Sequence, residues 1–310
     1  MLKGKDLISI HDLSASEVEE ILTLAGELKE KQKQGVKHHL LAGKSLGMIF
    51  EKASTRTRVS FEVGMYQLGG QALFLSGRDL QIGRGEPVRD TARVLSRYLD
   101  GIMIRTFGHD TLLEFAKWAD VPVINALTDL LHPCQALTDL LTIREHLQTD
   151  FKNLKLAFIG DGNNMANSLL YACAKTGMSF AIAAPEGYEL NPEIVRQAQE
   201  DAAASGAEIV QTHDINEAAA GANVLCTDVW TSMGEETERA VREKAFAGYQ
   251  INSELLGRAD RQAIVMHCLP AHRGEEITGE VVEKYAQVIF DEAENRLHTQ
   301  KAIMALLMGD

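Results

Sequence analysis

The sequence Glu-Lys-Ala-Ser-Thr-Arg-Thr-Arg, residues 51–58, lies between two apolar segments and indicates how the first half of the chain folds. Residues 45–50 form a short apolar run, which is typical of a buried strand. After the motif, Val59, Val63 and Tyr66 recur at i, i+4 and i+7, a spacing that predicts the core face of a helix. Residues 54–57 are therefore expected on a strand-to-helix turn, where backbone N–H groups and the positive end of the helix dipole point at one spot.

The side chains of this turn suit a tetrahedral dianion. Ser54, Thr55 and Thr57 offer hydroxyl donors, while Arg56 and Arg58 offer guanidinium groups that can bind phosphate oxygens in a bidentate manner. The alternative is that Ser54 is only a helix N-cap and that the arginines are solvated. Because five consecutive residues suit an anion and no acidic residue interrupts them, we interpret the turn as an anion site.

Length and charge limit the possible functions. The chain has 310 residues, enough for two α/β domains, and 45% hydrophobic with 24% charged residues is a globular composition. The net charge of −13 argues against a nucleic acid or an anionic membrane surface as partner. An anionic substrate therefore needs a local basic site, and the Arg-rich turn supplies one.

The cysteines give no sign of a disulfide framework or a metal site. Cys134, Cys173, Cys226 and Cys268 are widely spread, without a CxxC pair or metal-ligand spacing. The sequence also shows neither a secretory signal nor an 18-residue apolar run. We expect reduced thiols in a cytoplasmic protein.

Strands and helices are expected to alternate along the whole chain, which predicts parallel sheets with helices on both faces. We predict two doubly wound α/β domains that face each other across a cleft, spanning residues 1–148 and 149–290, with a last helix at 291–310 that returns to the first domain. The expected strands are 45–50, 71–75, 101–105, 121–124, 155–160, 179–184, 208–212, 223–227, 263–267 and 288–290.

Polar clusters follow six of these strands, and ligands of parallel sheets bind at the carboxyl ends of strands. The clusters are 52–58, Arg105, 132–135, 161–164, 228–233 and 267–273. His132 and Gln135 lie three apart at a helix start, so both can donate hydrogen bonds to a developing oxyanion. Taken singly, Arg105 could be a surface charge and His132 a core histidine.

The second half offers groups that suit an amino acid. Asn163 and Asn164 at a helix N-terminus suit a carboxylate, and Asp228 with Ser232 suits an ammonium group. Asp228 could instead cap the next helix, and Cys268 could be an apolar filler rather than part of a proton relay. The turn at 161–164 lacks the second and third glycines of a dinucleotide fingerprint, which disfavours a dehydrogenase.

Two motifs resemble those of the aspartate/ornithine carbamoyltransferase family: Ser-Thr-Arg-Thr-Arg at 54–58 and His-Pro-Cys-Gln at 132–135, with an arginine at 105 between them. The resemblance implies a fold of two facing domains and the transfer of a carbamoyl group from carbamoyl phosphate. It also implies residues that bind carbamoyl phosphate: Ser54, Thr55, Arg56, Thr57, Gln81, Arg105, His132, Gln135, Cys268, Leu269 and Arg296. Of these, Gln81 matches a residue that the family borrows across a subunit contact.

The motifs Asp-x-x-x-Ser-Met-Gly at 228–234 and His-Cys-Leu-Pro at 267–270 are similar to the branch of the family that uses free ornithine. The resemblance then implies citrulline and phosphate as products, in arginine metabolism, by attack of the neutral δ-amine after ordered binding and domain closure. It implies no metal or organic cofactor, and a trimer with sites at subunit contacts. The implied ornithine ligands are Asn163, Asn164, Asp228, Ser232 and Met233, and the implied catalytic residues are Arg105, His132, Asp228 and Cys268.

Three other functions stay open at this point: a sister carbamoyltransferase with another amine acceptor, a nicotinamide dehydrogenase and a non-catalytic scaffold. The sequence also does not reveal whether the physiological direction is the synthesis or the breakdown of arginine.

Overall fold

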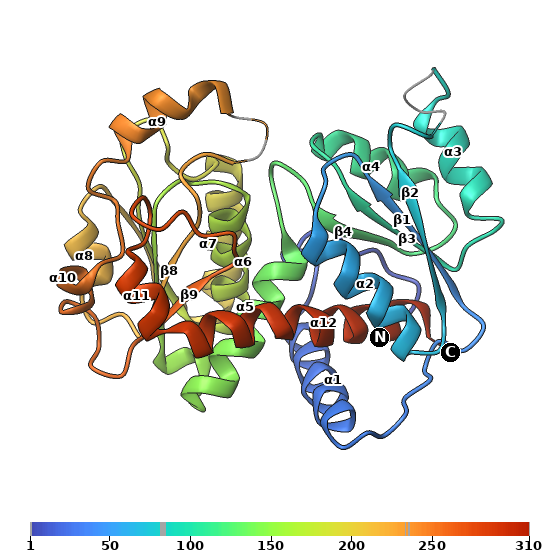
Figure 1. The fold of residues 1–310 in the computed structure, drawn as a ribbon, viewed down its shortest axis with the longest axis horizontal. Helices are drawn as coiled ribbons and strands as arrows, with labels where there is room; N and C mark the ends of the chain where they lie inside the picture. The colour runs from blue at the N-terminus through green and yellow to red at the C-terminus, as the bar shows by residue number, and fades with distance from the viewer. Residues whose placement is uncertain (1, 81–84, 233, 235, 310) are drawn as a thin grey trace. The chain divides into compact units, whose positions relative to one another are not determined.

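A computed structural model of the chain describes residues 2–80, 85–232, 234 and 236–309, and it forms two compact units (Figure 1). The first unit comprises residues 1–141 together with 295–310, and the second comprises residues 142–294. Each unit is built on its own parallel sheet, which confirms the predicted fold class.

The first sheet has four parallel strands in the order β2-β1-β3-β4. Its strands are β1 (Ser45–Phe50), β2 (Gln71–Ser76), β3 (Gly101–Arg105) and β4 (Val123–Leu127). Helices α3 (Val88–Leu95) and α4 (His109–Trp118) cover one face through an apolar cluster that includes Ile49, Ile104 and Phe115. The other face packs against the C-terminal helix, where Met308 lies against Gly101. The absence of a side chain at Gly101 allows this close contact. The remaining helices with residues in this unit are α1 (Ala15–Lys33), α2 (Thr55–Gln67), the start of α5 (Pro133–Leu147) and most of α12 (Ala286–Met308).

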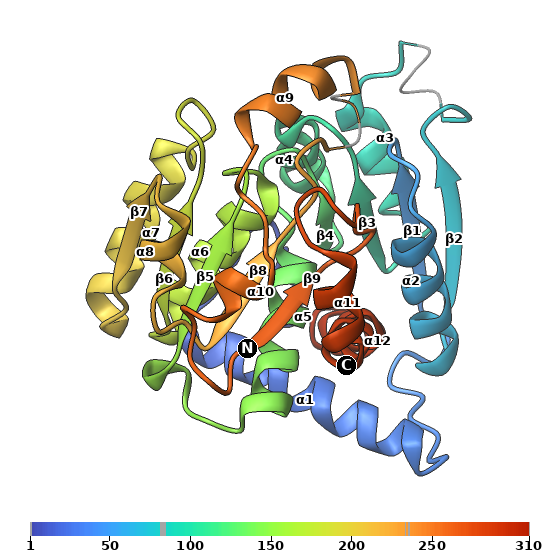
Figure 2. The ribbon, with the colours of Figure 1, turned by 60° about the vertical axis from the view of Figure 1, so that its left-hand side comes forward.

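The second sheet has five parallel strands in the order β7-β6-β5-β8-β9, which can be followed in Figure 2. Its strands are β5 (Lys155–Ile159), β6 (Ser179–Ala183), β7 (Ile209–Thr212), β8 (Val224–Thr227) and β9 (Ile264–His267). An apolar cluster that includes Ile159, Leu225 and Val265 packs under the short helices α8 (Ile215–Ala219), α10 (Ser253–Leu256) and α11 (Gly279–Lys284). Helices α6 (Asn164–Thr176) and α7 (Pro192–Ser205) pack together, and 3₁₀ turns lie at Phe151–Asn153 and Glu236–Glu238, the latter before α9 (Arg239–Ala245).

Both strand orders reverse at one point, and these two points locate the sites. In the first sheet the chain leaves β1 for β2 on one side and then returns to β3 on the other. In the second sheet it leaves β5 for β6 and β7 and then returns to β8. Ligands of open α/β sheets bind at the carboxyl ends of strands where the order reverses. In the first sheet, residues 51–58 follow β1 and Arg105 ends β3. In the second sheet, residues 160–164 follow β5 and Asp228 follows β8.

The apolar stripe on α2 faces solvent, so the prediction that it forms the core face is wrong. Val59, Val63 and Tyr66 are 51%, 36% and 80% exposed. The buried side of α2 instead carries Thr57, Phe61, Gly64 and Met65. This side is buried because Gly64 lets α12 approach closely: a Cβ at Gly64 would lie 3.0 Å from Met304 and 3.3 Å from Lys301.

Three predicted boundaries also differ from the structure. Residues 288–290, expected to form a strand, lie inside helix α12, because a run of three apolar residues fits a buried helix as well as a strand. The apolar spacing in the N-terminal segment predicts a helix over residues 6–34, whereas α1 begins at Ala15, since Ser14 and Glu17 form a capping box. The expected strand at 121–124 starts two residues later, at Val123. Among the described residues, no helix is long and apolar enough to span a membrane.

Candidate active site

The turn after β1 has the predicted form of a capped helix start. Ser54 is the N-cap of α2; its Oγ accepts a hydrogen bond from the backbone N–H of Thr57 at 3.2 Å and donates one to the Thr57 hydroxyl at 3.1 Å. Ser54 is half-buried, and Thr55 and Arg56 are exposed beside it. The remaining first-turn N–H groups have no intrahelical acceptor, which leaves the positive helix end available to an anion.

Arg58 contacts residues of α2 and β2. Its Nε donates to Glu62 at 3.0 Å, and its guanidinium carbon lies 3.9 Å from the centre of the Phe74 ring. An exposed i,i+4 ion pair and a cation–π contact thus hold the side chain over strand β2. Arg56, the other arginine of the motif, is exposed beside the turn.

Arg105 lies beside the turn because β1 and β3 are paired in parallel. Phe50 and Arg105 are register partners, and the backbone N–H of Glu51 donates to the Arg105 carbonyl at 2.9 Å. Thr106 also donates to the carboxylate of Glu51. The Arg105 side chain is buried, so the end of β3 places a cation below the surface at the reversal point of the sheet.

Arg296 from α12 joins two predicted motifs that lie far apart in the sequence. Its Nη2 donates to the Thr57 hydroxyl at 2.8 Å, and its Nη1 donates to the Gln135 side-chain carbonyl. The Gln135 amide in turn donates to Asp139 at 2.8 Å. The structure therefore brings Thr57, Gln135 and Arg296 together in one buried network.

Burial, together with two neighbouring arginines, favours the neutral form of His132. Burial lowers the pKa of His132 well below its usual value, and the charges of Arg296 and Arg105 lower this pKa further. A neutral imidazole can donate a hydrogen bond to a carbonyl oxygen without adding a third charge to the site. Nearby Cys134 is inert as a nucleophile because burial raises the pKa of its thiol to about 12.

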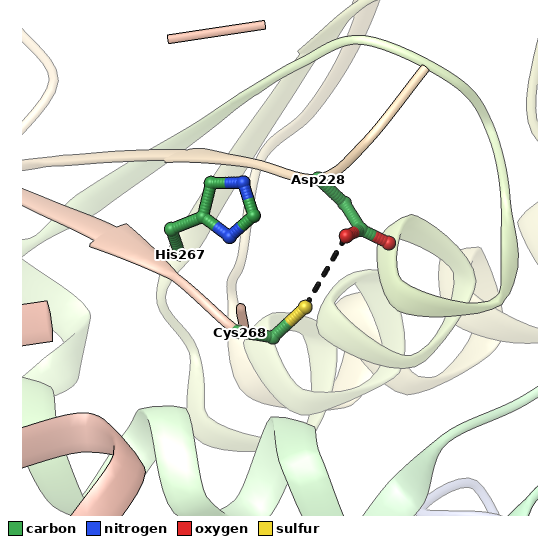
Figure 3. A group of neighbouring side chains, drawn as sticks. All are labelled: Asp228, His267 and Cys268. Atoms are coloured by element: carbon green, nitrogen blue, oxygen red, sulfur yellow. Dashed lines mark hydrogen bonds between the residues drawn. The ribbon is translucent and has the colours of Figure 1, made fainter. Parts of the chain in front are cut away.

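In the second unit, two predicted residues donate hydrogen bonds to the carboxylate of a third, Asp228, and Figure 3 shows the contact with Cys268. The Cys268 thiol donates to Oδ1 of Asp228 at 3.3 Å, and the Asn163 amide donates to Oδ2 at 3.0 Å. Asn163 is also the N-cap of α6, since its side-chain oxygen accepts from the N–H groups of Met165 and Ala166. The Asp228 side chain thus accepts hydrogen bonds from Asn163 and Cys268 at the reversal point of the sheet. It does not cap the following helix.

His267 supports the Cys268 loop rather than completing a metal site. The ligand atoms of Asp228, His267 and Cys268 lie within 4.8 Å of one another. However, Nδ1 of His267 accepts from the backbone N–H of Leu269 at 2.9 Å, and Nε2 bonds the buried Glu276 at 3.0 Å. Both ring nitrogens are thus engaged, and the imidazole fixes the backbone next to Cys268 and Leu269.

The remaining predicted residues are placed as follows. Asn164 begins α6 and Ser232 lies in the loop after β8, both half-buried. Gln81 and Met233 lie outside the described residues.

One ion pair at this half-site was not anticipated. Arg242 of α9 donates to Asp161 at 2.7 Å and to the Trp230 carbonyl at 3.0 Å, and both charged side chains are largely buried. The contact ties α9 and the loop after β8 to the turn that bears Asn163. Asp161 belongs to a predicted cluster, but nothing in the spacing around Arg242 indicates its partner.

Comparisons with known proteins show the family of both halves of the chain. A family model described as "Aspartate/ornithine carbamoyltransferase, carbamoyl-P binding domain" matches residues 5–145, and one described as "Aspartate/ornithine carbamoyltransferase, Asp/Orn binding domain" matches residues 152–307. The ornithine carbamoyltransferase of Syntrophotalea carbinolica is 57% identical over 305 residues, which cover 98% of this chain and 99% of the relative. That of Halalkalibacterium halodurans is 57% identical over 310 residues, or 100% and 97% of the two chains.

Solved structures give the same result. Ornithine carbamoyltransferase from Pyrococcus furiosus superposes with a TM-score of 0.95 at 50% identity, covering 99% of this chain and 98% of that one. The enzyme from Gloeobacter violaceus superposes with a TM-score of 0.87 at 52% identity, covering 100% of both chains.

Proposed function

The chain belongs to the aspartate/ornithine carbamoyltransferase family, and we infer that it transfers the carbamoyl group of carbamoyl phosphate to the δ-amine of L-ornithine, giving L-citrulline and phosphate. The observation that carries this inference is the pair of half-sites at the two sheet reversals. One combines a helix N-terminus, buried arginines and a neutral histidine, and the other combines a carboxylate, a thiol and a carboxamide.

For carbamoyl phosphate, we propose binding to the first unit, with the phosphate at the N-terminus of α2. Ser54, Thr55, Arg56 and Thr57 would hold its oxygens together with Arg105. This assignment is supported by the capped turn and by the helix end at the reversal of the first sheet. Arg296 would act on the phosphate side while fixing the hydroxyl of Thr57, to which it donates.

The carbamoyl carbon is the reacting centre. The neutral amine of ornithine forms a C–N bond there, the C–O bond to phosphate breaks, and the amine loses one proton. His132 and Arg105, with Gln135 and Thr57, would donate hydrogen bonds to the carbonyl oxygen as it gains negative charge. A neutral His132 is suited to this role because it donates without protonating the oxygen. Cys268 and Leu269 would also contact the carbamoyl group.

We propose that ornithine binds to the second unit. Asn163 and Asn164 would hold its carboxylate at the N-terminus of α6, and Ser232 and Met233 would be further ligands of ornithine. Asp228 and Cys268 would orient the δ-amine and help to remove its proton, a role supported by their direct hydrogen bond at 3.3 Å.

We also propose a trimer, in which Gln81 reaches a neighbouring subunit, and a cytoplasmic location. The exposed stripe of Val59, Val63 and Tyr66 supports an oligomer, because contiguous exposed apolar side chains mark interaction surfaces. The four cysteines are all free thiols, which supports a reducing compartment.

Initial rates with four amines test the proposed function. Product formation from carbamoyl phosphate is compared for ornithine, putrescine, N-acetylornithine and aspartate. We expect kcat/KM for ornithine to exceed that for each other amine by at least about a hundredfold, since a missing or blocked polar group leaves buried partners unpaired. A faster reaction with any of the other three would assign the chain to a sister activity, and no turnover at all would favour a non-catalytic scaffold.

A further inference from the structure

The loop that follows β9 carries a second cluster of ligand atoms, separate from the half-site around Asp228. It consists of His272, Glu275 and Glu276, in which one ligand atom of each residue lies within 4.8 Å of the other two. The proposed reaction uses none of these three side chains. The cluster therefore needs an explanation of its own.

Two buried atoms of the cluster make no hydrogen bond within the described part of the chain, and one of them, Nδ1 of His272, lies at ion-pair distance from Glu275. Glu276 is fully buried; its Oε1 accepts from His267 at 3.0 Å and from the backbone N–H of His272 at 2.6 Å. Its Oε2 has no hydrogen-bond partner within the described part of the chain, and neither has the buried Nδ1 of His272. Buried polar atoms are normally satisfied, so the remaining oxygen of the fully buried Glu276 points to a bound water or ion.

The third residue completes a ligand set. Oε2 of Glu275 lies 3.4 Å from Nδ1 of His272, while its Oε1 is held by Arg239 at 2.6 Å. In tetrahedral zinc sites with metal–ligand bonds of about 2.0–2.1 Å, neighbouring ligand atoms are about 3.3 Å apart. His272 and Glu275 already have this spacing, and Glu276 would need to move by at most about 1.5 Å to reach it.

We propose that His272, Glu275 and Glu276 bind a zinc ion, with water as the fourth ligand. One imidazole nitrogen with two carboxylates suits zinc, whereas magnesium and calcium prefer oxygen ligands alone. The side chains of His272 and Glu275 are 39% and 26% exposed, which gives the ion access from solvent. The hydrogen bond from His267 orients the Glu276 carboxylate, as partners of metal ligands commonly do.

The backbone of the loop holds these ligands in place. The N–H of Glu275 donates to the His272 carbonyl at 2.9 Å, and the N–H of Gly274 donates to the Ile277 carbonyl at 2.8 Å. The side chain of Gln250 donates to the Glu275 carbonyl at 2.7 Å. Because these hydrogen bonds already fix the loop, binding an ion here would cost little conformational entropy.

Titration calorimetry with Zn²⁺ alone tests the site, using tag-free full-length protein freed of metal with a chelator. We expect one ion per chain, with binding at least tenfold weaker in both His272→Ala and Glu275→Gln. His213→Ala is the matched control, because His213 is an exposed histidine that faces a single carboxylate, Glu189, at 3.9 Å. The control should bind zinc as the wild type does, and Mg²⁺ should give no heat.

One further variant, Cys268→Ser, separates this site from the half-site around Asp228. Cys268→Ser should retain the zinc affinity, and loss of binding in that variant would place the ion with Asp228 and Cys268 instead. Glu275→Gln keeps the shape of its side chain, so it tests the proposal even if His272→Ala fails to fold. Wild-type affinity in Glu275→Gln, or no zinc binding by the wild type, would overturn the proposal and leave a water molecule as the occupant of the cluster.

Discussion

The buried pair between Arg242 and Asp161 gives the sharpest stability prediction. The two side chains are 8% and 11% exposed, and Arg242 also donates to the Trp230 carbonyl and to Glu238. In Arg242→Met the Asp161 carboxylate stays buried without its cation, a change that costs about 3–5 kcal/mol in comparable pairs. At about 2–4 °C per kcal/mol for a unit of this size, the midpoint of thermal unfolding should fall by roughly 6–20 °C.

Urea unfolding followed by the fluorescence of Trp230 measures this cost in the second unit. A Trp118→Phe background leaves Trp230 as the single tryptophan, because the chain has two. Arg239→Met is the matched control: it lies one turn earlier on α9, its side chain is 54% exposed and its ion pairs lie at the surface, so the variant should unfold at nearly the wild-type urea concentration.

A double-mutant cycle with Asp161→Asn isolates the interaction between the two side chains. The double variant should lose less stability than the sum of the single variants, by about 2 kcal/mol or more. Because the pair anchors the turn of Asn163, Arg242→Met should also raise the KM for ornithine and leave carbamoyl phosphate binding unchanged. Equal costs for Arg242→Met and Arg239→Met, or additive single variants, would refute this reasoning.

Three further changes have defined outcomes. Thr57→Val should weaken carbamoyl phosphate binding about tenfold to a hundredfold in calorimetry, because Arg296 loses a charge-assisted acceptor, and wild-type affinity would remove this hydroxyl from the site. Cys268→Ser should raise the KM for ornithine up to about tenfold with carbamoyl phosphate affinity retained, whereas an unchanged ornithine profile would make Cys268 an apolar filler. Burial lowers the pKa of Lys301 from 10.5 to about 8, so the unfolded chain binds more protons between these pH values and stability rises with pH across that window. The free energy of unfolding of the wild type relative to Lys301→Met should therefore increase by at most about 3 kcal/mol between pH 8 and 10.5, and a flat difference would show that the lysine titrates normally.

Local patterns predicted most of the framework. The nine parallel strands lie within two or three residues of expected positions, because each is a short apolar run between turn signals. Ser54 and Asn163 cap helices at the predicted turns, since capping depends only on the next few residues. The fold class and the location of both half-sites follow from these elements.

What the sequence patterns missed depends on distant partners. The buried face of α2 is decided by the approach of α12 at Gly64, which no periodicity within α2 reveals. Arg58 packs on the ring of Phe74, a contact with strand β2 that the spacing within the motif does not reveal. Arg296 donates hydrogen bonds to Thr57 and Gln135, which lie 239 and 161 residues away in the sequence. Only the family resemblance suggested that these residues act together.

The central claim is that a cationic, hydroxyl-lined turn binds carbamoyl phosphate, and a calorimetric titration of Arg56→Gln and Arg58→Gln tests it most directly. These two variants remove the same charge from the same turn, but Arg58 is held by Glu62 and Phe74. The wild type and Arg58→Gln should bind one carbamoyl phosphate per chain with similar affinity, and Arg56→Gln should bind at least about a hundredfold more weakly. No heat with the wild type, or equal affinities for the two variants, would contradict the account.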